Sequence, residues 1–381
     1  MMYIIDADSF AFISIRNRQE MNSIRALAAA LTLAVIADTA MAQQNDTMPA
    51  VPRFERFKQI NADSTPLSST LPTWTYGWSF SVTGDSYSAT VIGSDPTTDT
   101  TAKIPVYLIP VRIRVGVNGG TTFSPDTLQS NGKSAVANTK DSPLLKHLTF
   151  DEAGTDLGNT QYIDAYQRAN FWSSASTNTR WHTLLGPPTV LPIQEIKAPL
   201  KYGIVGVEFG VTVALADIDF IDTQLQAILV NFPEITPSSL VIFEMYDTYL
   251  TSEEPRYGGC CIGGYHSALS SGQVYMAFSN VGTTGVFSQD VDALSHELAE
   301  SVMDPFVDNN SPCGLLEVAG PLEDTANYGT YPVCARRLHV PPAGLDVHHV
   351  FRCAGNHVAG RPHKFPGHGA RSLRERRLES K

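Results

Sequence analysis

The sequence predicts an α+β fold, with a β-rich N-terminal part over residues 71–200 and a part over 201–334 that combines strands with helices. Several stretches alternate apolar and polar residues, which is typical of half-buried strands. Two later stretches carry apolar residues at helical spacing instead. The chain also has 28 Gly and 24 Pro, which favour many turns and argue against a helix bundle.

The first predicted element is a hairpin. Trp74, Tyr76 and Trp78 share one face of a strand, and the alternation resumes at Tyr87 after a turn at 83–86. An aromatic stripe of this kind packs into a core or serves as a ligand platform. The other predicted elements are strands at 111–117, 240–246 and 274–278, a single strand at 205–215, a Gly- and Cys-rich loop at 258–268, and helices at about 217–231 and 289–303.

The N-terminal region predicts export. Residues 21–42 combine Arg25, a short apolar run and an Ala-Met-Ala cleavage site, which together indicate a secretory signal peptide. Because a signal peptide begins near the N-terminus, we interpret residues 1–20 as an upstream extension from an overcalled start. Residues 43–70 are polar and read as a linker. We therefore expect a secreted, extracellular or periplasmic protein without a transmembrane anchor.

The charge is unevenly distributed. The formal net charge of −11 argues against a nucleic-acid partner. Residues 335–381 nevertheless hold ten of the 27 Lys and Arg and only three of the 38 Asp and Glu. This basic tail is interpreted as a disordered extension, a metal- or polyanion-binding tail, or the product of a frameshift.

The second predicted helix contains the sequence His296-Glu297-Leu298-Ala299-Glu300. His296 and Glu300 are four residues apart, so both side chains project from one face and can hold a metal ion together. The HExxH motif of zinc proteases uses this spacing, with its Glu as general base. Without further context, the same residues would form a solvated helix face.

Downstream sequence adds context to this motif. Glu317 follows Glu300 by 17 residues, and gluzincins place a third, acidic ligand after a comparable connection. The order helix, strand, loop, strand and motif helix also suits a zincin, in which an edge strand lines the substrate cleft.

These residues carry a family resemblance. The segment SHELAESVMDPFVDNN followed by CGLLEV resembles secreted bacterial proteins of unassigned function with SHExxE, DP and LEVGDP motifs. QYIDAYQRANFW and CCIGGYHSA fit the same group. The chain is more distantly similar to plant phosphate-induced, exordium-like proteins. The resemblance covers about residues 71–333 and implies a zincin-like metallopeptidase fold.

Carried over from this resemblance, His296, Glu300 and Glu317 are expected to be metal ligands and Glu297 the general base. Zn²⁺ is the expected ion, and the second Glu makes Ca²⁺ or Mn²⁺ acceptable. One departure is that Gly320 stands where the group's LEVGDP motif has Asp. If that Asp orients a ligand, metal affinity falls about 10- to 100-fold without it.

Other polar residues are weaker candidates. His266, in the sequence GGYHSA, is either a ligand, a transition-state donor or a packed histidine. His182 carries less weight. Asp164 and Arg168 either shape a cleft together with Trp172 or form a buried ion pair between two layers.

The cysteines predict disulfides in an exported protein. Cys260 and Cys261 are adjacent, and we expect each to bond a separate partner, because a ring closed between neighbours is strained. Cys313 is the first candidate partner and Cys334 the next, which leaves Cys353 over. Free buried thiols are the alternative.

Two functional hypotheses follow. The first is a secreted, zincin-like, metal-dependent hydrolase that acts on peptides. The second is a non-catalytic secreted protein that retains the fold and binds cell-surface or wall polymers through its aromatic hairpin. Glu300 and Gly320 favour the second hypothesis, whereas the intact Glu297 favours the first.

Overall fold

The chain divides into two units, residues 1–50 and 51–381. A computed structural model describes part of the second unit, in the ranges 53–54, 70–80, 83–116, 120–129, 131–152, 155–208, 210–280, 292–312 and 314–316. The expectations that lie outside the described residues concern the start 1–20, the signal peptide 21–42, the tail 335–381, Glu317, Gly320, Cys313, Cys334 and Cys353.

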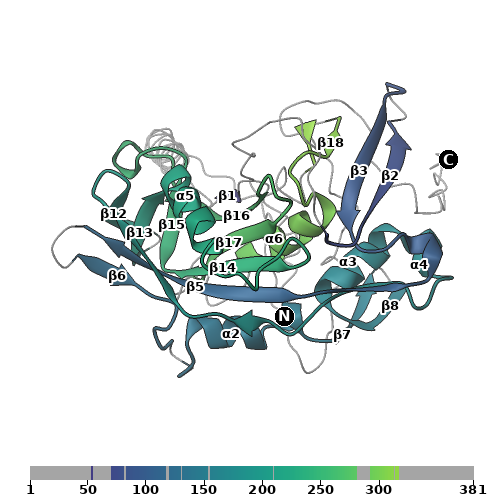
Figure 1. Ribbon diagram of the computed structural model, residues 1–381, viewed down its shortest axis with the longest axis horizontal. Helices are drawn as coiled ribbons and strands as arrows, with labels where there is room; N and C mark the ends of the chain where they lie inside the picture. The colour runs from purple at the N-terminus through teal and green to yellow at the C-terminus, as the bar shows by residue number, and fades with distance from the viewer. Residues whose placement is uncertain are drawn as a thin grey trace, which may run out of the picture. The chain divides into compact units, whose positions relative to one another are not determined.

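A mixed sheet of eleven strands organises the described residues (Figure 1). Its main path runs β10-β5-β14-β17-β16-β15-β13-β12, while β1 pairs with β16, and β6 and β11 pair with β5. The strands are β1 (Arg53–Phe54), β5 (Val106–Val115), β6 (Thr121–Phe123), β10 (Thr189–Val190), β11 (Gln194–Ala198), β12 (Gly203–Glu208), β13 (Val211–Asp217), β14 (Leu240–Tyr246), β15 (Thr248–Thr251), β16 (Ile262–Ala268) and β17 (Val274–Asn280).

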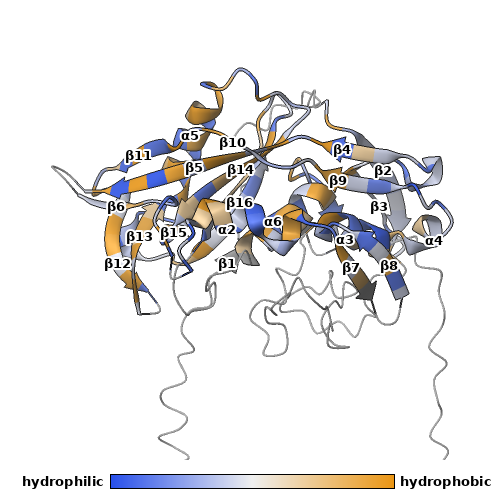
Figure 2. Ribbon diagram, turned by 90° about the horizontal axis from the view of Figure 1, so that it is seen from below, coloured by the Kyte–Doolittle hydropathy of each residue, from blue (hydrophilic) through white to orange (hydrophobic). Residues whose placement is uncertain are grey.

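The central strands of this sheet are buried on both faces. In β14, Leu240 and Ile242 enter one hydrophobic core, whereas Val241 and Phe243 enter the other. The sequence of β14 is a nearly continuous apolar run because the strand is parallel to both of its neighbours and both faces of the sheet are covered. Toward β6, β5 instead alternates hydrophobic and hydrophilic residues (Figure 2). The predicted strands at 240–246 and 274–278 are confirmed.

Helices cover the two faces of the sheet. Helix α5 (Ile218–Leu229) packs Ile221 and Leu225 into one core, and α6 (Asp292–Met303) packs Leu298 into the other. Both predicted helices are thereby confirmed. The remaining described helices are α2 (Ala135–Asp141), α3 (Tyr162–Asn170) and α4 (Trp172–Ala175). None of the helices described is both long and apolar enough to span a lipid bilayer.

The predicted aromatic hairpin is confirmed as β2 (Thr73–Ser79) paired with β3 (Ser86–Ile92). Trp74 and Tyr76 meet the ring of Phe171 edge-on, at centroid distances of 4.9 and 5.0 Å. The stripe therefore contributes to the core that α6 and α3 also bury. The other two-stranded sheets are β4 (Thr101–Ile104) with β9 (His182–Leu185), β7 (Leu148–Glu152) with β8 (Thr155–Thr160), and β18 (Asn310–Ser311) with β19 (Gly314–Leu315).

The prediction of a single strand at 205–215 is wrong. The segment forms β12 and β13, which pair antiparallel from Gly203↔Ala216 to Glu208↔Val211. Gly210 sits between them at a φ of +80°, a conformation that glycine adopts readily. Because two residues separate β12 from β13, the alternation of apolar and polar residues continues in phase from one strand to the next, and the sequence looks like one strand.

The prediction of a loop at 258–268 is also wrong in its second half. Residues 262–268 form β16, all buried, which pairs antiparallel with β17. Gly264 lies in this strand, close to Glu297 of the helix at 292–303, rather than in a turn, so the composition of the segment was a misleading signal.

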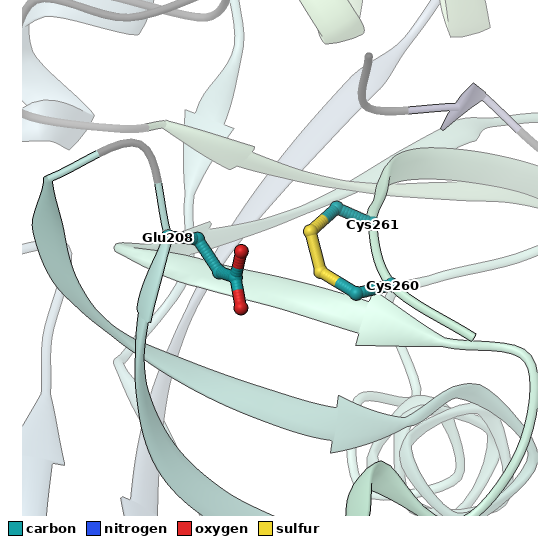
Figure 3. Close-up of side chains that lie close together, drawn as sticks. All are labelled: Glu208, Cys260 and Cys261. Carbon is teal, nitrogen blue, oxygen red and sulfur yellow. A yellow bond between two sulfur atoms is a disulfide. The ribbon is translucent and has the colours of Figure 1, made fainter. Parts of the chain in front are cut away.

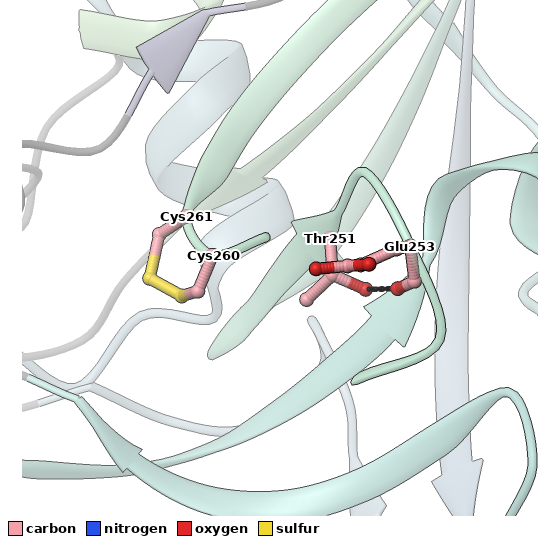
Figure 4. Close-up of a disulfide and its surroundings, with 4 residues drawn as sticks. All are labelled: Thr251, Glu253, Cys260 and Cys261. Atoms are coloured by element: carbon pink, nitrogen blue, oxygen red, sulfur yellow. Dashed lines mark hydrogen bonds between the residues drawn. A yellow bond between two sulfur atoms is a disulfide. The ribbon is translucent and has the colours of Figure 1, made fainter. Parts of the chain in front are cut away.

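The expectation that Cys260 and Cys261 would not bond each other is contradicted, because a disulfide joins them (Figure 4). The peptide bond between them is cis, and their Cα atoms lie 3.0 Å apart.

Candidate metal centre

Helix α6 brings three ionisable side chains toward the sheet. Leu294, Leu298 and Val302 bury its apolar stripe, and the helix packs against β16, β17 and β3. Glu297 and Glu300 are three residues apart and therefore project from neighbouring positions on the buried side. His296 precedes them and is the most exposed of the motif residues, at 8 %.

Gly264 in β16 lets α6 approach closely. A Cβ at this position would lie 3.0 Å from the Ala277 carbonyl oxygen, 3.0 Å from Glu297 Cγ and 3.1 Å from Glu297 Oε1. A larger residue would therefore force these neighbours to shift, whereas glycine lets the Glu297 carboxylate lie close over the strand. Two residues later, His266 lies on the same face of β16, because side chains alternate along a strand.

His266 therefore meets both carboxylates of the motif. Its Nδ1 lies 3.2 Å from Glu300 Oε2 and 3.4 Å from Glu297 Oε2. The other oxygen of Glu300, Oε1, lies 3.2 Å from His296 Nε2. His266, Glu297 and Glu300 each offer one ligand atom, and these atoms lie within 4.8 Å of one another. The three residues form a buried group that can hold a metal ion.

The second ring nitrogen of His266 fixes its tautomer. His266 Nε2 lies 3.0 Å from the backbone carbonyl oxygen of Asp304. A carbonyl oxygen only accepts hydrogen bonds, so Nε2 carries the proton. In a neutral imidazole the lone pair of Nδ1 then faces two carboxylates. Either a second proton or a cation must lie between these three acceptors, and metal-bound histidines commonly show this contact to a carbonyl.

Glu297 is the least satisfied member of the group. It is fully buried, and neither carboxylate oxygen makes a hydrogen bond within the described part of the chain. A buried carboxylate without hydrogen bonds carries a desolvation cost of several kcal/mol unless it is neutralised or bound to a cation.

The pKa values follow from burial and from these contacts. Burial raises the pKa of Glu297 to about 7. Burial alone would also raise the pKa of Glu300, but the charges of His296 and His266 hold it well below its usual range. Burial lowers the pKa of His266, yet its contacts with Glu297 and Glu300 outweigh this effect and raise it well above the ordinary value.

The distances also suit a small divalent ion. Tetrahedral zinc with bonds of 2.0–2.2 Å to nitrogen and oxygen holds its donors about 3.3–3.6 Å apart. The 3.2 and 3.4 Å separations from His266 Nδ1 lie close to that range. The donor set of one imidazole and two carboxylates fits zinc and tolerates harder cations. The residues present therefore fit a metal ion in the type of their donor atoms and in the two separations from His266 Nδ1.

The structure thus brings together four of the residues expected from the sequence, namely His266, His296, Glu297 and Glu300. Glu317 lies outside the described residues. The backbone carbonyl of Asp304 and the missing side chain of Gly264 were not foreseen. The GGYH sequence did signal a close approach at Gly264, but it was interpreted as a loop.

The other candidates lie apart from this group. His182 Nδ1 contacts Asp164 Oδ2 at 2.8 Å, and Asp164 also accepts the Thr183 N–H. Arg168 donates to the carbonyl oxygens of three residues, Leu157, Ala175 and Trp181. The hydrogen bonds of Asp164 and Arg168 thus go to other groups, which contradicts the expected ion pair between them.

Comparisons with protein-family models, with curated proteins and with solved structures find no match for this chain.

Proposed function

We propose that this chain is a secreted metal-dependent hydrolase that cleaves peptide bonds, with the ion held by His266, Glu297 and Glu300. The observation that carries the proposal is the position of His266 Nδ1, which faces two buried carboxylates while Nε2–H donates to the Asp304 carbonyl oxygen. The HExxE motif, the signal-peptide pattern at 21–42 and the resemblance to secreted bacterial SHExxE proteins of zincin type support it.

Zn²⁺ is the ion we propose, because imidazole and carboxylate ligands at these separations suit it. A bound divalent ion supplies Lewis-acid chemistry and lowers the pKa of a water molecule. Glu297 and Glu300 provide two negative charges that balance such an ion. Asp304 holds the ring of His266 in the orientation that ligation requires.

His296 is our proposed general base. Its Nε2 contacts Glu300 Oε1 at 3.2 Å, so a carboxylate orients the ring and favours its protonated form after proton transfer. It is also more exposed than His266, Glu297 or Glu300. In the assignment expected from the motif, His296, Glu300 and Glu317 are ligands and Glu297 is the base. The present assignment exchanges the roles of His296 and Glu297.

The test combines metal content with peptide hydrolysis for two variants of the full mature chain. We expect His296→Ala to keep the ion and to lose about 10²–10⁴-fold in activity, because only proton transfer is impaired. Glu297→Gln should lose both the ion and activity. His182→Ala, in a histidine outside the group, is the matched control and should keep both.

Two outcomes would change the account. If His296→Ala loses the ion while Glu297→Gln keeps it without activity, the roles are those of the HExxE motif. If the metal-loaded protein cleaves no member of a mixed peptide library, the hydrolase proposal fails.

A second candidate function is a non-catalytic binding protein with a structural ion. One observation favours it, because His266, Glu297 and Glu300 are each at most 1 % exposed. In that case chelation should lower the melting temperature, and the metal-loaded protein should bind cell-surface polymers without cleaving peptides.

A further inference from the structure

A second group of potential ligands lies away from the first, around the Cys260–Cys261 disulfide. Glu208, at the end of β12, points its carboxylate toward the two sulfur atoms (Figure 3). One ligand atom from each of Glu208, Cys260 and Cys261 lies within 4.8 Å of the other two. The function proposed above makes no use of these residues.

The surroundings of this group are apolar. Cys261 is 2 % exposed and packs with Val213, Leu215 and Tyr249 in a small cluster separate from the two main cores. Cys260 packs against the same cluster and is partly exposed. An acidic side chain beside such a cluster would be expected to have a positively charged partner.

Glu208 lacks such a partner. It is half-buried and forms no ion pair and no side-chain hydrogen bond with any residue that the structure describes. By contrast, Glu254, on the loop that leads to the disulfide, pairs with Arg256 at 2.6 Å. Among the described residues, the potential metal ligands grouped with the Glu208 carboxylate are the two sulfur atoms.

We propose that Glu208, Cys260 and Cys261 form a second metal site, which takes a thiophilic divalent ion when the disulfide is reduced. Two thiolates on one tetrahedral ion, with bonds of about 2.3 Å, lie about 3.8 Å apart. Once the bond is broken, the sulfur atoms separate to about that van der Waals distance, so ligation demands little further movement. The Glu208 carboxylate supplies a third donor.

The chemistry balances with a dithiol reductant. Its thiolate attacks the Cys260 sulfur, the more accessible of the two, and the Cys260–Cys261 bond breaks. The reductant leaves as a disulfide after supplying two electrons and two protons, and both cysteines become thiols. Binding of a divalent ion then releases the two thiol protons as two metal–sulfur bonds form. A disulfide oxidant reverses the sequence and expels the ion.

This second group also lies close in sequence to the candidate metal centre. Cys261 directly precedes β16, which carries Gly264 three residues and His266 five residues beyond the disulfide. The proposal is nevertheless independent of the hydrolase function, since its ligands and its chemistry are separate.

Cadmium is the probe, because thiolate-to-cadmium charge transfer absorbs in the ultraviolet, whereas carboxylate and imidazole ligation does not give this band. The full chain is reduced with a phosphine, freed of reductant and titrated with Cd²⁺. A Cys260→Ser/Cys261→Ser variant, which keeps the other three cysteines, is treated in the same way. We expect reduction to expose two more thiols in the native chain than in the double variant. The charge-transfer band of the native chain should exceed that of the double variant by the absorbance of one bound Cd²⁺.

Glu208 is tested by Glu208→Gln, with Glu253→Gln, an exposed acid near the same loop, as the matched control. Loss of a ligating carboxylate should weaken Cd²⁺ binding about 10-fold or more, and the control should leave it unchanged. Equal thiol counts or equal bands in the native chain and the double variant would overturn the site. Unchanged affinity in Glu208→Gln would overturn the three-donor assignment.

Discussion

His266 and Asp304 are joined through the imidazole Nε2 and a backbone carbonyl oxygen at 3.0 Å, across 38 residues of sequence. The turn after α6 thereby sets the tautomer of a side chain on β16. With Nε2–H donated to this carbonyl, Nδ1 faces Glu297 and Glu300, which is the orientation that the proposed metal ligation requires. The candidate metal centre depends on a turn as much as on the helix motif.

Substitution of Asp304 tests this turn. Its Oδ1 accepts the backbone N–H groups of Asp308 and Asn309, each at 3.0 Å. We expect Asp304→Ala to loosen the carbonyl that orients His266 and to weaken metal binding about 10- to 100-fold. Competition with a chromophoric chelator measures the affinity. Asp308→Ala, in an exposed side chain that leaves these backbone bonds intact, is the control, and equal affinities in the two variants would contradict the prediction.

Gly264→Ala tests the close approach of α6 to β16. The added methyl group would meet Glu297 Cγ and the Ala277 carbonyl oxygen, both at 3.0 Å. We expect a loss of about 1–3 kcal/mol of unfolding free energy together with reduced metal content. Gly77→Ala is the matched control in another strand, where the nearest atom would be the Tyr87 carbonyl oxygen at 3.5 Å. Native-like metal content in Gly264→Ala would show that Glu297 need not occupy its observed position.

Asn309 connects the aromatic hairpin to the end of α6. Its side-chain amide exchanges two hydrogen bonds of 2.8 Å with the Thr90 backbone and donates to the Met303 carbonyl oxygen at 2.7 Å. Asn309→Ala leaves these buried backbone groups without partners, so we expect a loss of about 2–4 kcal/mol in urea unfolding. The neighbouring exposed Asn310→Ala should cost about 0.5 kcal/mol or less. Similar losses for both variants would refute the role of Asn309.

Glu244 predicts a pH dependence of stability. It is fully buried on β14, accepts a 2.8 Å hydrogen bond from Thr139, and burial raises its pKa to about 8 from the ordinary 4.5. The folded protein therefore keeps a proton that the unfolded chain loses between pH 4.5 and 8. Stability should fall across this window by about 1.4 kcal/mol per pH unit from this group, then level off.

Glu244→Gln should remove that part of the slope and be more stable than the native chain at pH 8. Urea unfolding from pH 5 to 9 provides the measurement. The exposed Glu234→Gln should leave the slope unchanged. If the native chain and Glu244→Gln show parallel pH profiles, the buried carboxyl does not retain its proton.

The spacing of apolar residues predicted the helices and strands that bury one apolar face. The helix beginning at Ile218 and the hairpin of Trp74 and Tyr76 each carry one apolar face, so spacing alone identified them. Periodicity failed at β16, where every residue is buried and glycines replace the usual apolar side chains. It also failed between β12 and β13, because the strands are separated by an even number of residues and the alternation therefore continues across them.

The candidate site was predictable only as far as it lies on one helix. The spacing of His296 and Glu300 follows from helix geometry. The position of His266 beside these residues depends on the pairing of β16 with β17, and its tautomer depends on a backbone carbonyl. Neither feature leaves a pattern in the sequence. Likewise, a bond between adjacent cysteines depends on local backbone geometry that residue types do not encode.

Elemental analysis of the purified mature chain, beside His266→Ala and His182→Ala, determines whether the group of His266, Glu297 and Glu300 holds an ion. We expect about one divalent ion per folded chain, lost in His266→Ala and kept in His182→Ala. A folded native protein without an ion after incubation with Zn²⁺, or an ion that His266→Ala retains at full occupancy, would contradict this expectation.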